Sequence, residues 1–92
     1  MSVLESQELE NWKEELEDKK KEIFKKRNVI EKRVEKFKVR LSIINSLNSG
    51  DQYLISNQVM DKLKTYESEL AQFDGEHNII LNEINSILQK LK

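Results

Sequence analysis

Few side chains in this sequence could take part in chemistry, and His77 is the first to consider. It is the only histidine, and the chain has no cysteine. Asp74 and Glu76 stand close to it, so acid–base chemistry or metal binding would be its possible roles. A metal ion needs two or three further ligands, whereas the residues expected to face His77 are two lysines and an isoleucine. We therefore predict a half-buried packing role for His77, with a pH-sensitive contact as the alternative, and no metal or cofactor.

A second candidate lies near the start of the chain, where Ser6, Gln7, Glu8, Leu9 and Glu10 follow one another. This stretch resembles the SQELD motif of small two-helix phosphatases that act on sporulation response regulators. Glu10 replaces the aspartate of the motif, and the stretch lies on the first predicted helix instead of the second. The resemblance implies activity on an aspartyl phosphate. Because the sequence has no glycine-rich phosphate loop and no paired-carboxylate cleft, we predict that the chain is not an enzyme and has no small-molecule substrate.

Helices must position these side chains, because proline is absent and Gly50 and Gly75 are the only glycines. The strongest turn signal is the stretch 46–52, Ser-Leu-Asn-Ser-Gly-Asp-Gln. After it, a seam recurs with alternating gaps of four and three residues, as in a coiled-coil helix. Its members are Val59, Leu63, Tyr66, Leu70, Phe73, His77, Ile80, Ile84, Ile87 and Leu91.

The first half carries a second stripe, which repeats every seven residues at Leu9, Leu16, Ile23, Ile30, Phe37 and Ile44. Trp12, Val34 and Leu41 join it, whereas Lys13, Lys20 and Arg27 interrupt its companion column. If the chain turns at 49–51, residues whose numbers sum to about 100 lie at the same level, because both helices rise about 1.5 Å per residue. The two stripes obey this rule. We predict an all-α antiparallel two-helix hairpin about 65 Å long, with helices over about 5–47 and 53–91 and a turn over 48–52.

Gly75 is the one position where the second helix could break. It falls on the outer side of that helix, where the missing side chain breaks no core contact. A kink at Asp74 and Gly75 is one alternative. A three-helix bundle broken there is the alternative fold. Because the seam continues through Gly75 without a change of spacing, the sequence favours a single helix.

A hairpin with one seam has a small core, so an isolated hairpin of this length is expected to be marginally stable. The apolar stripe widens near the turn and again at the open end, beyond what one helix covers. A broad stripe that only wraps a twisted hairpin is one explanation, and packing against another helical protein or a second copy, as in a four-helix bundle, is the other. We predict partner contacts at Trp12, Val29, Val34, Leu41, Ile43, Leu81 and Leu88.

Charge is strongly segregated along the chain although its net charge is −1. Residues 1–18 carry seven acidic side chains and one lysine, and residues 19–40 carry eleven basic and three acidic side chains. By the register rule, Arg33 lies opposite Glu67 and Glu69, and Lys26 opposite Asp74 and Glu76, so pairing across the hairpin accounts for part of the basic charge. A basic belt for an acidic protein, nucleic acid or an anionic surface is the alternative. The belt has few aromatics, which disfavours nucleic acid.

The whole chain resembles the WXG family of small type VII secretion proteins and the small helical partners of LXG toxins. The resemblance rests on the length, the two long helices and Gly50 in the turn. Asn48 stands where that family has tryptophan, and Leu70 stands four residues after Tyr66, where the YxxxD/E export signature has an acid. The resemblance implies an adaptor or chaperone that pairs side by side with another helical hairpin.

These patterns together predict a nonenzymatic helical-hairpin interaction protein, such as an adaptor, a chaperone or a small regulator. The alternative function is binding of nucleic acid or anionic surfaces through residues 19–40. No apolar run approaches the roughly 18 residues of a membrane span, and the start of the chain lacks the apolar core of a signal peptide. We therefore expect a cytoplasmic protein, exported with a partner if the type VII resemblance holds.

Overall fold

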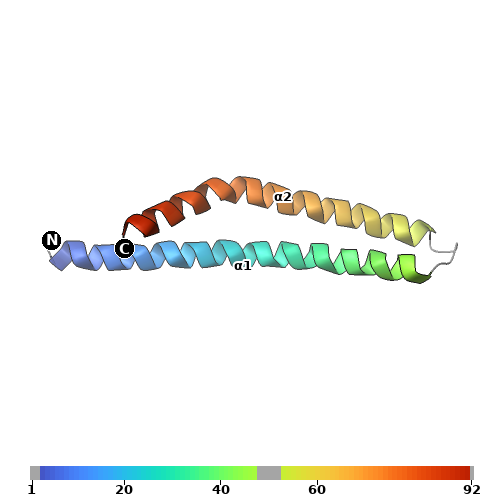
Figure 1. The fold of residues 1–92 in the computed structure, drawn as a ribbon, viewed down its shortest axis with the longest axis horizontal. Coiled ribbons are helices and arrows are strands. Elements are labelled where there is room, and N and C mark those ends of the chain that lie inside the picture. Colours follow the sequence, from blue (N-terminus) through green and yellow to red (C-terminus); the bar gives the residue numbers. More distant parts are fainter. Residues whose placement is uncertain (1–2, 48–52, 92) are drawn as a thin grey trace.

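The computed structural model describes residues 3–47 and 53–91, which form two long antiparallel helices (Figure 1). Helix α1 spans Val3–Leu47 and helix α2 spans Tyr53–Lys90. The predicted all-α hairpin is therefore confirmed, and the helix ends lie within two residues of those expected. The predicted turn at 48–52 lies outside the described residues. The molecule is a rod that measures 73 × 18 × 14 Å.

The predicted seams hold the two helices together. The ten residues predicted for the second seam, nine on α2 and Leu91 directly after it, are all buried or half-buried. The six members of the seven-residue stripe on α1 are buried or half-buried as well. Lysine, glutamate and leucine dominate the remaining positions of α1 and favour a helix by their intrinsic propensity. Only four apolar side chains of the described residues are buried, namely Ile23, Ile30, Val34 and Ile84. The core is therefore a single thin layer.

Contacts between the helices confirm the predicted register. Arg27 Nε donates to Asp74 Oδ1 at 2.7 Å, and Arg33 Nη1 lies 3.8 Å from Glu69 Oε1. Nearer the turn, the ring centroids of Phe37 and Tyr66 are 5.2 Å apart. The numbers of each pair sum to just over 100, as expected for a chain that turns near residue 50.

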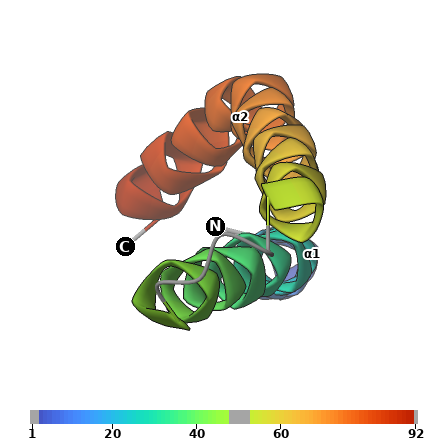
Figure 2. The same cartoon turned by 90° about the vertical axis from the view of Figure 1, so that its right-hand side faces the viewer.

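Helix α2 is bowed, whereas α1 runs nearly straight (Figure 1). In this view the orange part of α2 rises above α1 and the last turns descend toward it (Figure 1). Viewed from the turn end, α2 passes from one side of α1 to the other, so the helices wind around each other (Figure 2). A β-carbon at Gly75 would meet no atom within 4 Å. Because α2 is continuous through Gly75, the three-helix alternative is wrong.

Trp12 departs from the predicted seam, since 47% of it is exposed. The half-buried positions next to the stripe are Lys13, Lys20 and Arg27, which the sequence analysis treated as interruptions. Long basic side chains can lay their methylene stems along an apolar neighbour and keep the charged end in water. The companion column of α1 consists of Lys13, Lys20, Arg27, Val34 and Leu41, and all five are buried or half-buried. The column is therefore continuous in space, although its first three members are cationic.

Candidate interaction surface

The hairpin exposes more surface than a compact protein of its mass. A compact monomer of 10.9 kDa exposes about 5,600 Å². This chain exposes 7312 Å². The excess is about twice the roughly 800 Å² that one partner contributes to a standard protein–protein interface. Burial of that order against a second chain is therefore geometrically available.

The seven predicted contact residues fall into three groups. Trp12, Val29 and Ile43 of α1 are about half exposed. Leu41, Leu81 and Leu88 are half-buried along the edges of the seam. Val34 is only 5% exposed and belongs to the core of the hairpin, so the single chain does not offer it to a partner.

A groove runs between the helices on one side of the open half. It consists of two adjoining depressions that share Asn82 and Asn85. Phe24, Leu81 and Leu88 contribute apolar surface, and the amide side chains of α2 that line it are Asn78, Asn82, Asn85 and Gln89. Charged side chains of α1, including Glu17, Lys20 and Arg27, complete the lining. We call it the amide-lined groove. Sequence reasoning found Leu81 and Leu88 but missed the amides, although their spacing of four, three and four residues was a readable signal.

Arg27 is the most connected polar side chain of the hairpin. Its Nε and Nη2 donate to the two carboxylate oxygens of Asp74 at 2.7 and 3.1 Å, and its Nη1 donates to Glu31 Oε2 at 2.8 Å. The hydrogen bond from Arg27 lowers the pKa of Asp74, and partial desolvation opposes that effect. The same bond raises the pKa of Arg27. This forked pair joins the two helices at mid-length.

His77 is half-buried and packs locally. Its ring stacks on Phe73, with centroids 4.0 Å apart and an interplanar angle of 21°. Its Nδ1 lies 2.8 Å from the Phe73 carbonyl oxygen, which fits a ring that donates a proton from Nδ1. These contacts fit the packing role predicted for His77. Asp74 and Arg27 line the same depression as His77. Among the described residues, no group of three or more acidic, histidine or cysteine side chains could hold a metal ion.

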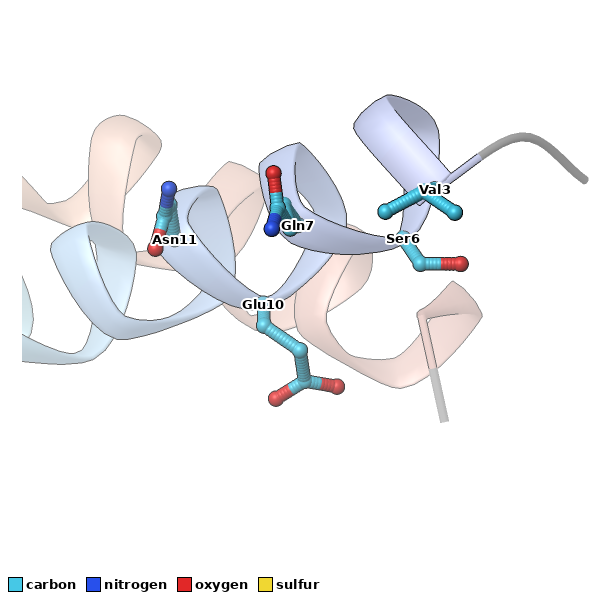
Figure 3. Close-up of a pocket in the computed structure, with 5 residues that line it drawn as sticks. All are labelled: Val3, Ser6, Gln7, Glu10 and Asn11. Atoms are coloured by element: carbon cyan, nitrogen blue, oxygen red, sulfur yellow. The ribbon is translucent and has the colours of Figure 1, made fainter.

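The start of α1 carries a shallow depression lined by Val3, Ser6, Gln7, Glu10 and Asn11 (Figure 3). All five side chains come from the first turns of a single helix. Gln7 and Asn11 point to one side of α1, and the carboxylate of Glu10 points to the other (Figure 3). The two residues that the phosphatase resemblance would require, Gln7 and Glu10, do not converge here.

The basic segment of α1 is only partly neutralised. Arg33 reaches Glu69 as predicted, but Lys26 pairs with Glu22 of its own helix, at 3.3 Å, and Arg27 takes Asp74 instead. The reason is position, because Arg27 stands in the companion column and Lys26 stands outside it. Within the described ranges, Lys21, Lys25 and Lys32 form no ion pair and are exposed.

Comparison of the chain with known families, curated proteins and solved structures identifies no relative. The likeness to WXG proteins therefore rests on architecture and on Gly50, which lies outside the described residues. Neither described helix has a stretch apolar and long enough to cross a membrane.

Proposed function

We propose that this chain is a helical-hairpin interaction protein that works by binding and completes its core against another helical chain. The observation that carries the proposal is the small core, because four buried apolar side chains support two helices of 45 and 38 residues. A two-helix hairpin with so thin a core is only marginally stable on its own. A partner that binds only the folded hairpin therefore stabilises it by mass action.

The amide-lined groove supports the proposal because it matches the needs of an incoming helix. Leu81 and Leu88 offer apolar contact, and the amide side chains offer donors and acceptors without a fixed charge. An adaptor, a chaperone and a small regulator all use such a surface. The type VII resemblance would add a secreted helical partner.

The test compares Leu88→Lys with Leu54→Lys, a control at a leucine of the same helix that is 74% exposed. Light scattering reports association, and circular dichroism reports helix content and melting across concentration. We expect the parent to melt at higher temperature as its own concentration or that of an added partner rises. Leu88→Lys should lose the gain from an added partner that binds the amide-lined groove and keep most of its helix signal, and Leu54→Lys should behave like the parent. A monomer stable by about 5 kcal/mol or more at every concentration would refute the proposal.

A second candidate function uses the outer face of the basic segment. Phe24 is 48% exposed and shares a shallow depression with Lys21, Lys25 and Asn28, and the ion pair of Arg27 and Glu31 lines the same depression. The depression therefore combines an aromatic ring with two lysines that form no ion pair among the described residues. Such a surface could hold an acidic ligand, including a nucleic-acid strand. If it does, log affinity for a single-stranded oligonucleotide should fall steeply with log salt concentration, and Lys21→Glu with Lys25→Glu should abolish binding.

A further inference from the structure

Helix α1 carries a second stripe that its own hairpin leaves uncovered. Each of its members directly precedes a residue of the seven-residue stripe or of its companion column. The members are Glu8, Trp12, Glu15, Lys19, Glu22, Lys26, Val29 and Arg33. One residue turns a helix by about 100°, so this stripe faces sideways from α2, in the direction of a neighbour in a four-helix bundle. All of its residues are exposed. We call it the outer stripe.

Charge changes sign along the outer stripe. Its first half carries Glu8 and Glu15, and its second half carries Lys26 and Arg33. The two halves cannot meet within one chain, because Glu8 and Arg33 stand about 37 Å apart on the same helix. Helix α2 offers the acidic half little, since Lys90 is the one lysine or arginine among its described residues beyond Lys64. Among the described residues, Lys26 pairs with Glu22 and Arg33 with Glu69, whereas Glu8 and Glu15 take part in no ion pair, although Lys19 lies one helical turn from Glu15. Glu8 and Glu15 therefore have no basic counterpart across the described part of the hairpin.

A second copy of α1, laid antiparallel on the outer stripe, supplies that counterpart. If residues whose numbers sum to 41 face each other, Glu8 faces Arg33, Glu15 faces Lys26, and Lys19 faces Glu22. Every one of these pairs joins opposite charges. A parallel arrangement would instead place each charge against its own copy, which is destabilising.

The same register also brings the apolar members together. Trp12 and Val29, which are 47% and 51% exposed, have numbers that sum to 41. Twofold symmetry creates this contact twice in the pair. An exposed tryptophan is a side chain that commonly anchors an interface.

From the charge complementarity and this coincidence of apolar positions, we propose that the outer stripe binds a second copy of the chain, antiparallel, with Trp12 against Val29 and Glu15 against Lys26. The open halves of two hairpins then overlap, and the turns lie at opposite ends. The inference rests on the proposed function and names the partner. It uses the outer stripe and leaves the amide-lined groove open.

The experiment exchanges charges between Glu15 and Lys26. Either Glu15→Lys or Lys26→Glu places two like-charged pairs in the dimer and should weaken self-association roughly tenfold or more at about 50 mM salt, measured by sedimentation. An equimolar mixture of the two variants places a lysine against a glutamate at both contacts, so it should form heterodimers with the affinity of the parent. The matched controls are Glu14→Lys and Lys25→Glu, which are exposed one residue away from the stripe. They should dimerise like the parent.

Trp12 gives an independent readout, because it is the only tryptophan. Its emission should shift to the blue as the parent associates, and Val29→Glu should remove the shift, whereas Val39→Glu, at a valine 58% exposed, should keep it. Single variants that associate like the parent, or a mixture that fails to recover association, would overturn the proposal. A marginally stable monomer would also overturn it and leave the proposed function standing with a different helical partner.

Discussion

The two helices meet in one seam, yet they are built differently. Helix α2 contributes two unbroken columns, polar only at His77, and its last turns carry few charges. Helix α1 contributes one apolar column and one that begins with Lys13, Lys20 and Arg27. It nevertheless supplies three of the four buried side chains. The difference suggests that α2 is adapted to apolar contact along its whole length, whereas α1 combines a narrow apolar strip with charged faces suited to fixing register and partner.

The largest expected effect comes from the most buried residue of α2. Ile84 is 3% exposed, so Ile84→Ala should lower the free energy of unfolding by about 2–4 kcal/mol through lost burial and an unfilled cavity. Urea unfolding followed by circular dichroism measures the change. The matched control is Ile79→Ala, at a residue 71% exposed, which should change stability by less than about 0.5 kcal/mol. Equal effects at both positions would mean that the seam of α2 is not the main support of the hairpin.

A smaller effect of opposite sign is expected in the cationic column of α1. Lys20 is half-buried at the level of Ile80, so Lys20→Leu should raise the free energy of unfolding by about 1 kcal/mol through added apolar burial. Thermal and urea melts measure the gain. Lys21→Leu, at the exposed next position, should change stability by less than about 0.5 kcal/mol. A loss of stability in Lys20→Leu would show that the charge itself supports the hairpin and would remove the contrast between the helices.

The smallest effect concerns the contact that joins the helices at Arg27. Because the folded state lowers the pKa of Asp74, its contribution is complete above the unfolded pKa of about 3.9 and is lost as the pH falls through the folded value. Melting between pH 6 and pH 2 should therefore show an acid-induced decrease that Asp74→Asn reduces by a few degrees at most, since the pair is partly exposed. Asp61→Asn, on an exposed residue of the same helix, is the control. An identical acid profile for the parent and Asp74→Asn would assign the register to apolar packing alone.

The fold was readable from the sequence because one physical rule dominates a hairpin. Seam spacing indicated which face of each helix is buried, and equal rise per residue indicated the register. The rule placed Phe37 opposite Leu63, and the structure pairs its ring with Tyr66, one seam position further along. The candidate surface was less readable. Leu81 and Leu88 followed from the wide stripe, but Val34 is buried in the core of the hairpin, and Trp12, which the spacing also assigned to the seam, is 47% exposed. A position next to a seam can lie on either side of it, and only the winding of the helices decides which.

The sequence by itself determined the two helices, their antiparallel register and the segregation of charge, because these depend on spacing along the chain. The tertiary structure decided which partner each charge takes. Arg27 rather than Lys26 binds Asp74, since a rotation of one residue separates a side chain that points along the seam from one that points to water. It also decided how the helices wind around each other (Figure 2) and which side chains line the amide-lined groove. This winding follows from packing along the whole length, which no local stretch of sequence specifies.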